Sequence, residues 1–258
     1  MSVITISNQK GGVGKTTTAS AFAAGLKYLY PELRILAIDL DASMNLSAYM
    51  GAWEFKPSIL DVFLKDIEIK DAIIQRQGID FLPASANLAR AEMLFSEAER
   101  PYILKSVIEP IRDDYDYIII DTPPNLGAMM LMAFTASDKI IIPMSLDSFA
   151  MRGVSALKQT IDLAKKHLNS DLEIDGILLT KRKVTTRRDK NISKAMTEVS
   201  KFLDAKIYES SIRDSVVVGD AQMETKTIYE FSINHDATKD YIRFIQEFIE
   251  GGKTDEQE

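Results

Sequence analysis

The chain carries the stretch Lys10-Gly11-Gly12-Val13-Gly14-Lys15-Thr16-Thr17, a glycine-rich turn that ends in a lysine and two threonines. It fits the phosphate-binding pattern G-x-x-x-x-G-K-[ST], except that Gln9 stands where the pattern has its first glycine. Lys10 adds a second lysine to the pattern. Because glycines let the backbone curl so that its N–H groups point inward, the stretch predicts a phosphate-binding loop of altered sequence.

The segments on either side of this loop support the same interpretation. Val3–Ile6 is typical of a short buried strand, and residues 17–30 are typical of an alanine-rich helix. In a strand, loop and helix of this order, the loop amides and the positive end of the helix face the phosphates. We expect Lys15 to reach the β- and γ-phosphates of a nucleotide and the Thr16 hydroxyl to bind Mg²⁺.

Further apolar runs predict the fold class. They are typical of fully buried parallel strands, with helical patterns between most of them. The runs are Val3–Ile6, Leu33–Ile38, Ile79–Leu82, Tyr117–Ile120, Lys139–Pro143 and Ile174–Leu179. This alternation predicts an α/β fold with a doubly wound, mostly parallel sheet and helices on both faces. Ligands of such sheets bind at the carboxyl ends of the strands.

The remaining segments predict one domain over residues 1–250. We expect a helical excursion at 57–77, one long or two shorter helices at 87–111 with Pro101 in a first turn, a helix at 191–203, a short strand at 206–208 and a last helix at 237–249. Gly251-Gly252 is expected to end the last helix, so that residues 251–258 form a polar, disordered tail.

Composition excludes several classes of site. The 258 residues include no cysteine, which excludes disulfides, thiolate-bound zinc and cysteine-held iron–sulfur clusters. Two histidines make a histidine-rich metal site improbable. The chain shows neither an apolar run of about 20 residues nor a signal peptide, so we expect a cytoplasmic protein. A net charge of −7 argues against nucleic-acid binding over the whole surface, but a local basic patch can still bind DNA.

Carboxylates follow two of the predicted strands. Asp39 and Asp41 end the second strand, and Asp121 ends the run Ile118-Ile119-Ile120. A hard cation that keeps part of its water shell needs anionic oxygen nearby, so Asp121 is the expected Mg²⁺ residue, through water, with Asp39 as a further candidate. Of Asp39 and Asp41, one is expected to orient the attacking water while the other supports the loop.

Three segments together resemble the deviant Walker A ATPases of the ParA/MinD family. They are Asn8–Thr17, Ile38–Asp41 and Tyr115–Pro124, and the likeness extends over nearly the whole chain. The resemblance implies that two subunits sandwich two ATP molecules in a homodimer, with Lys10 reaching the phosphates of the partner subunit. It also implies that Asp41 positions the attacking water, which makes Lys10, Lys15 and Asp41 the expected catalytic residues.

The chain departs from the family directly after Asp41. Relatives commonly have Asp-Pro-Gln-Gly-Asn, whereas this chain has Asp41-Ala42-Ser43-Met44-Asn45. Asn45 is kept in register, while the three residues before it are replaced. The geometry of this loop is therefore the least predictable part of the site.

Within the family, the chain resembles the short ParA group, which includes Soj-like proteins. It lacks the cysteines of nitrogenase iron proteins, its end is not the basic amphipathic helix of MinD-type proteins, and nine residues precede Lys10, too few for an N-terminal helix-turn-helix domain. The resemblance implies non-specific DNA binding by the ATP-bound dimer, a nucleoid-associated location, and hydrolysis stimulated by a ParB-like centromere-binding partner, with no membrane contact.

A basic segment offers a surface for DNA. Residues 181–190 hold six cations, of which Lys181, Lys183, Arg187, Arg188 and Lys190 are the expected DNA-binding residues. A charge run of this kind is otherwise a solvated loop. Lys181 and Arg182 follow a strand end near the adenine site of the family, so they serve either the base or DNA. Arg213 is a further candidate for ATP or DNA.

Two other functions use the same fold. One is a MinD-like or other positioning ATPase that acts on a protein or a membrane rather than on DNA. The second is a small-molecule ligase, which would need a substrate pocket that the sequence does not disclose.

Overall fold

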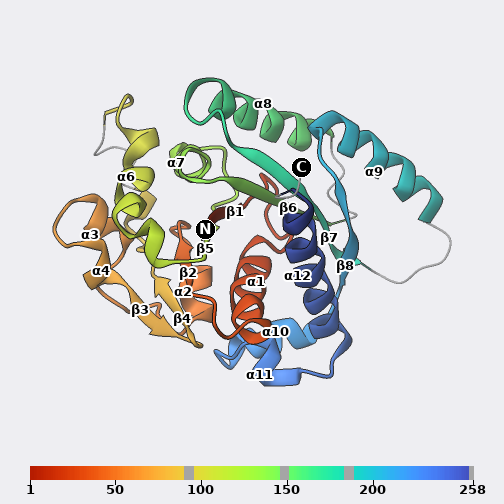
Figure 1. Ribbon diagram of the computed structural model, residues 1–258, viewed down its shortest axis with the longest axis horizontal. Coiled ribbons are helices and arrows are strands. Elements are labelled where there is room, and N and C mark those ends of the chain that lie inside the picture. Colours follow the sequence, from red (N-terminus) through yellow and green to blue (C-terminus); the bar gives the residue numbers. More distant parts are fainter. Residues whose placement is uncertain (90–95, 146–150, 183–188, 256–258) are drawn as a thin grey trace.

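An eight-stranded sheet forms the centre of the computed structural model, which describes residues 1–89, 96–145, 151–182 and 189–255 (Figure 1). The strand order is β3-β4-β2-β5-β1-β6-β7-β8. Its strands are β1 (Ser2–Ile6), β2 (Ile35–Asp39), β3 (Ile74–Arg76), β4 (Ile79–Leu82), β5 (Tyr117–Asp121), β6 (Lys139–Ser145), β7 (Glu173–Arg182) and β8 (Ile207–Arg213). β3 pairs with β4 in the antiparallel direction, and the other pairs are parallel.

Helices cover both faces of this sheet, which confirms the predicted doubly wound α/β fold. The α-helices are α1 (Lys15–Leu29), α2 (Asn45–Tyr49), α3 (Ile59–Phe63), α4 (Ile69–Ala72), α6 (Ile103–Ile108), α7 (Ala128–Ala136), α8 (Met151–His167), α9 (Asp189–Leu203), α10 (Val216–Met223), α11 (Ile228–Ser232) and α12 (Asp236–Asp255). Two 3-10 helices, η1 (Arg100–Tyr102) and η2 (Glu109–Asp114), flank α6.

The central strands are apolar on both sides because both sides are buried. In β1, Ile4 and Ile6 join the core beneath α1 and α12, whereas Val3 joins the core beneath α6 and α7. In β5, Ile119 belongs to the first core and Ile118 to the second. This alternation explains why these strands appear in the sequence as continuous apolar runs.

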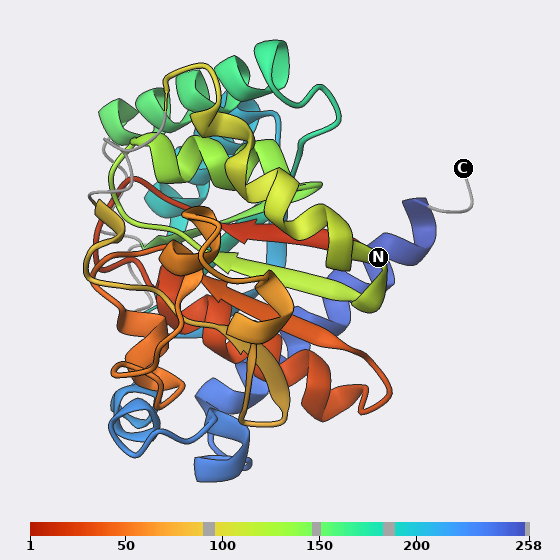
Figure 2. The same ribbon diagram turned by 90° about the vertical axis from the view of Figure 1, so that its left-hand side faces the viewer.

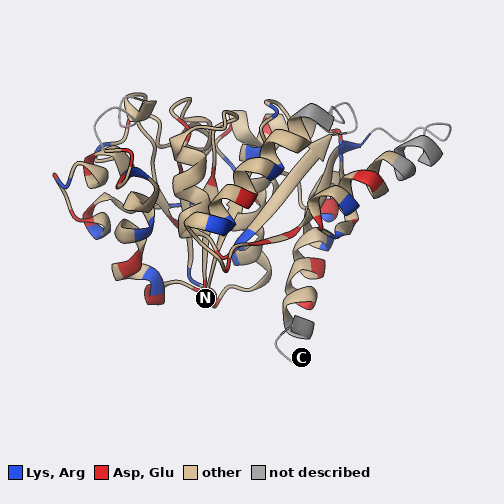
Figure 3. Cartoon of the chain, turned by 90° about the horizontal axis from the view of Figure 1, so that it is seen from above, with Lys and Arg blue, Asp and Glu red and all other residues tan. Residues whose placement is uncertain are grey.

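The carboxyl ends of the parallel strands meet at one edge, at the left in Figure 2. The loops after β1, β2 and β5 all emerge there, so the glycine-rich stretch and the three aspartates share one edge. Both chain ends lie toward the opposite edge. In Figure 3, Lys, Arg, Asp and Glu are spread over the surrounding helices and loops, while the strands are largely uncharged.

Two predicted elements differ from the structure. The segment 57–77 is not helical throughout, because after α3 and α4 it ends in β3. Gln77 and Gly78 both have positive φ, at 51° and 78°, and form the tight turn into β4. The last helix does not end at the glycine pair, since α12 continues through Gly251 and Gly252 to Asp255. Of the expected tail, residues 256–258 lie outside the described part.

Other expected elements are found with small shifts. The predicted strand at 206–208 is longer, as β8, and the predicted helix at 191–203 is α9. Pro101 does lie in a first helical turn, that of η1. The rest of the segment 87–111 contains α6 and the start of η2, and residues 90–95 lie outside the described part.

Gly25 shows how closely α1 packs. A Cβ atom at Gly25 would overlap the Tyr229 hydroxyl and Cδ1 of Ile245, whereas a Cβ at Gly219 of α10 would meet nothing within 4 Å. Although alanine is the better helix former, we expect Gly25→Ala to lower the free energy of unfolding by about 1–3 kcal/mol through overpacking. Urea denaturation measures this, with Gly219→Ala as the control that keeps or raises stability. Equal effects of the two changes would contradict the packing account.

Candidate functional site

The glycine-rich stretch forms a loop between β1 and α1. Gly12 and Gly14 have φ of 74° and 89°, the left-handed region that favours glycine. Helix α1 starts at Lys15, directly after Gly14, so Lys15 and Thr16 lie in its first turn. The unpaired amides of that turn and the positive end of the helix therefore face the loop, which is the arrangement that binds phosphate.

Side chains from neighbouring strands hold this loop in place. Asn8 donates from Nδ2 to the carbonyl oxygen of Pro143 at 2.7 Å and accepts from the amide of Lys10 at 3.0 Å. Thr180, near the end of β7, donates its hydroxyl to the carbonyl oxygen of Val13 at 2.7 Å. The sequence did not single out Asn8 or Thr180 as site residues, although Asn8 begins the first of the segments that resemble the family.

The two lysines of the loop differ in exposure. Lys15 is buried, and its Nζ lies 3.4 Å from the carbonyl oxygen of Lys10. Burial lowers the pKa of Lys15, and the negative charges of Asp121 and Asp41 oppose that shift. Lys10 is exposed at the start of the loop. Lys15 is thus directed into the site, whereas Lys10 lies on its surface.

Asp121 ends β5 as a fully buried carboxylate. Neither of its oxygens has a hydrogen-bond partner among the described residues. Burial raises the pKa of Asp121 well above its usual value and the neighbouring Asp39 raises it further, whereas the Thr16 hydroxyl and the Lys15 charge oppose the shift. The Thr16 hydroxyl is thus near without completing a hydrogen bond. Buried carboxylates are normally paired, so Asp121 calls for a ligand.

The surroundings of Asp121 fit magnesium. The described residues contain no cluster of three or more His, Cys, Asp or Glu side chains that could enclose a metal ion. Mg²⁺ commonly keeps several waters and is bound by one or two protein oxygens together with substrate phosphates. The Thr16 hydroxyl and the unpaired carboxylate of Asp121 supply such a partial set of oxygens.

Asp39 and Asp41 have different surroundings. The Asp39 carboxylate is fully buried and accepts hydrogen bonds from the amide of Asp41 at 2.9 Å and from the amide and hydroxyl of Ser47, both at 2.8 Å. Burial raises the pKa of Asp39 to about 6. Asp41 lies at the edge of the site, 7% exposed, and accepts from the amide of Ser43 at 2.8 Å. This geometry favours Asp39 as the loop support rather than as a metal ligand.

The altered loop after Asp41 keeps a turn that suits glycine. Met44 has φ 56° and ψ 30°, in the left-handed region, and stands where the resembling family has glycine. Its amide donates to the carbonyl oxygen of Asp41 at 2.8 Å. A side chain in this conformation costs about 1–2 kcal/mol, which the partly buried Met44 side chain offsets by packing against the core.

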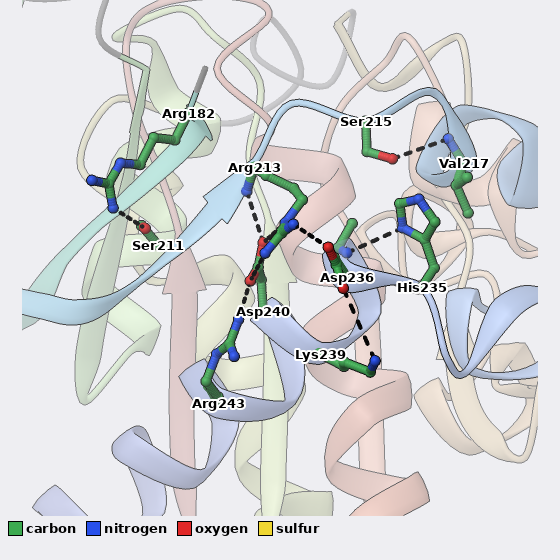
Figure 4. A network of polar contacts seen from close by, with 11 residues as sticks. Arg182, Ser211, Arg213, Ser215, Val217, His235, Asp236, Lys239, Asp240 and Arg243 are labelled. Carbon is green, nitrogen blue, oxygen red and sulfur yellow. Dashed lines mark hydrogen bonds and ion pairs between the residues drawn. The ribbon is translucent and has the colours of Figure 1, made fainter. Parts of the chain in front are cut away.

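The two arginines predicted for ATP line one cavity of about 540 Å³ between β7, β8 and α12. Arg182 donates to the Ser211 hydroxyl at 3.2 Å. Figure 4 shows the Arg213 guanidinium between Asp240, at 2.7 Å, and Asp236, at 2.5 Å. Asp240 also pairs with Arg243. The charge of Arg213 is therefore balanced within the chain.

Of the residues predicted to bind DNA, only Lys181 can be placed with its side chain. It is exposed and has a φ of 51°. Lys183, Arg187 and Arg188 lie outside the described residues, and Lys190 lies in α9 with no description of its side chain.

Thr17, the last residue of the glycine-rich stretch, accepts a hydrogen bond from the side-chain amide of Gln222 in α10 at 3.4 Å.

Comparison with known proteins gives one family model over part of the chain and relatives that align over nearly all of it. A family model described as an AAA domain matches residues 1–174. The chain is 34% identical to the sporulation initiation inhibitor protein Soj of Bacillus subtilis, covering 97% of this chain and 99% of Soj. It is 33% identical to the chromosome partitioning protein ParA of Myxococcus xanthus, covering 96% of this chain and 87% of that ParA.

A solved structure agrees with the fold. It is cobyrinic acid a,c-diamide synthase from Mycobacterium smegmatis with bound ADP and magnesium. The TM-score is 0.84 at 28% identity, covering 98% of this chain and 95% of that chain. The likeness covers nearly the full length of both chains, so the fold of this chain is that of a protein solved with ADP and magnesium.

The unpaired carboxylate predicts an unusual effect on stability. Without nucleotide or metal, we expect Asp121→Asn to raise the free energy of unfolding at neutral pH, because burial disfavours the charged carboxylate and raises its pKa. A raised pKa in the folded state means that the wild type loses stability as pH rises from its usual value, so the difference grows from about pH 4 upward. Urea denaturation across pH measures it.

The control is Asp240, an aspartate that is 3% exposed and whose carboxylate pairs with Arg213 and Arg243. Asp240→Asn should lower stability at neutral pH, because it removes the negative charge that these two cations pair with in the folded protein, where the pKa of Asp240 is lowered. An Asp121→Asn variant less stable than the wild type at neutral pH would contradict the account of Asp121.

Proposed function

The chain belongs to the ParA/Soj family of P-loop ATPases, and we propose that it is a ParA-type ATPase for partition of a plasmid or chromosome. In this proposal an ATP-bound homodimer binds DNA without sequence preference at the nucleoid, and a ParB-like partner stimulates slow hydrolysis. The observation that supports it most is the unpaired carboxylate of Asp121 beside the Thr16 hydroxyl and Lys15. The chain that carries it aligns with 99% of the length of Soj at 34% identity.

In this proposal each residue of the site has a role. The amides of Gly11–Gly14 and the first turn of α1 bind the phosphates, and Lys15 neutralises the β- and γ-phosphates. Thr16 and Asp121 would hold Mg²⁺, which offsets the phosphate charge when bound. Asp41, at the exposed edge of the site, orients the attacking water.

Lys10 supports the proposed dimer. It is exposed at the start of the loop, where it would reach the phosphates of a nucleotide held by the partner subunit. A cation at that place offsets the repulsion between two facing polyphosphates and stabilises charge in the transition state. ATP would then hold the two subunits together, and its hydrolysis would release them.

The expected test of the site uses two substitutions. Lys15→Ala removes the main cation for the phosphates and should abolish ATP binding. Asp41→Ala should keep ATP binding and the ATP dimer but lower the hydrolysis rate by about 100-fold or more, because the attacking water is no longer oriented. Binding of a fluorescent ATP analogue, sedimentation of the dimer and phosphate release measure the three steps.

These variants separate binding from chemistry. Normal turnover by Asp41→Ala would remove Asp41 from the catalytic role. ATP binding by Lys15→Ala at the wild-type affinity would contradict the placement of the nucleotide on the loop.

The basic segment at 181–190 supports DNA binding by charge. We expect Arg187→Ala with Arg188→Ala to weaken non-specific DNA binding and to reduce the slope of log K against log salt by about 2 for each subunit that contacts DNA, since each phosphate contact contributes about 0.9. Fluorescence anisotropy with ATP measures this at several salt concentrations. Because neither residue belongs to the loop, ATP-driven dimerisation should survive. An unchanged affinity and slope would exclude these arginines.

The alternative proposal is a MinD-like or other positioning ATPase that acts on a protein or a membrane. In the described part of the chain, no helix has the length and apolar character needed to cross a bilayer. Co-sedimentation with DNA and with anionic liposomes, each with ATP, separates peripheral membrane binding from DNA binding. The likeness to a diamide synthase favours a small-molecule ligase as a further alternative. ATP turnover that requires a carboxylic acid substrate would support that function.

A further inference from the structure

We propose that Asp39 and Ser47 are positioning residues for hydrolysis, and that Ser47 ties the place of Asp41 to the chain segment after β4. The proposal rests on the proposed ATPase function, in which Asp41 orients the attacking water. Asp39 and Ser47 would act only through Asp41, without contributing to the affinity for ATP.

Asp39 holds the backbone of Asp41 directly. It is the last residue of β2, and its Oδ1 accepts the amide of Asp41 at 2.9 Å. The register of the sheet fixes Asp39 itself, because it lies beside Asp121 of β5. A shift of this carboxylate would therefore move the Cα atom of Asp41 and change the direction of its side chain, while the glycine-rich loop would stay in place.

Ser47 fixes the other oxygen of Asp39. Its amide and its hydroxyl both donate to Oδ2 at 2.8 Å. The same hydroxyl oxygen accepts the amide of Ala84 at 3.0 Å. Ala84 lies two residues after the end of β4, so Ser47 connects β2, α2 and the segment after β4. Hydrogen bonds therefore run without a break from Ala84 through Ser47 and Asp39 to the backbone of Asp41.

Hydrogen bonding separates Asp39 from a ligand-binding role. Asp39 and Ser47 are 0% exposed, as is Asp121, but both oxygens of Asp39 accept hydrogen bonds within the chain, whereas those of Asp121 accept none among the described residues. Keeping a carboxylate in register beside Asp121 in the core is unfavourable by itself. Nonpolar side chains at these two positions would pack better than two buried carboxylates. The unfavourable burial of Asp39 therefore indicates that this residue serves the loop through its hydrogen bonds.

The chain contains a matched control. Ser58 also donates both its amide and its hydroxyl to a single carboxylate oxygen, that of Asp61, at 2.7 Å. Ser58 is 3% exposed and caps α3, and in the described part of the chain it makes no hydrogen bond to the loop that follows β2. Ser47→Ala and Ser58→Ala thus both remove a serine hydroxyl that donates to a carboxylate, and Ser47→Ala also removes the acceptor of the Ala84 amide.

The experiment measures single-turnover hydrolysis, binding of a fluorescent ATP analogue and urea denaturation for each variant. We expect Ser47→Ala to lower the hydrolysis rate by about 10-fold to 100-fold, as misplaced groups do, with an unchanged dissociation constant for ATP. Ser47→Thr keeps the hydroxyl and should restore most of the rate. Ser58→Ala should lose stability and keep the rate.

A double-mutant cycle distinguishes positioning from general loosening. In the Asp41→Ala background, Ser47→Ala should cause no further loss of rate, because its effect passes through Asp41. If Ser47→Ala does not fold, Asp39→Asn takes its place in the test. It replaces one acceptor oxygen by a donor, so it should also lower the hydrolysis rate without changing the dissociation constant for ATP.

Three results would overturn the inference. They are a wild-type rate for Ser47→Ala, an equal loss of rate for Ser58→Ala, and an additive loss in the Asp41→Ala background. A wild-type protein that binds no ATP would instead overturn the proposed function, and the inference with it. The wild-type arm of the binding measurement makes this case visible.

Discussion

The unpaired, buried carboxylate of Asp121 is the constraint on which the site depends. The parallel register places it beside Asp39, so two carboxylates end adjacent strands inside the core. Their mutual repulsion and loss of water are unfavourable unless cations are near. Lys15 supplies one charge within the chain. The remaining imbalance favours a bound cation, which explains why Mg²⁺ together with nucleotide suits this site and why the folded protein would gain stability from them.

The fold reduces this strain by giving the two carboxylates different partners. Asp39 receives one hydrogen bond from the amide of Asp41 and two from Ser47 of α2, whereas the oxygens of Asp121 have no such partner among the described residues. Asn8 and Thr180 then hold the glycine-rich loop to β6 and β7. Because β6 and β7 supply these contacts, the sheet itself holds the glycine-rich loop in place, which is the kind of preorganisation that catalysis requires.

The sequence predicted the loop, the sheet and the edge at which the aspartates meet, because glycine spacing and apolar runs have direct structural causes. The residue pattern alone could not separate Asp39 from Asp41, since their roles depend on where the turn begins after β2, and only the family resemblance pointed to Asp41. Ser47 carries no pattern of its own, because a serine after a loop is usually a cap or a surface residue. The turn at Gln77 is fixed by contacts that are distant in the sequence, since its side-chain amide donates to the carbonyl oxygens of Tyr49 and Thr225. The continuation of α12 through Gly251 and Gly252 runs against the low helix propensity of glycine.

The central claim is that Asp121 and Thr16 hold magnesium together with ATP on this loop. Thermal unfolding of the wild-type protein with ATP tests it most directly, measured once with Mg²⁺ and once with EDTA. The account predicts that ATP with Mg²⁺ raises the midpoint of unfolding clearly, whereas ATP with EDTA raises it little, since the unpaired carboxylate then repels the phosphates. An equal rise under both conditions would contradict it.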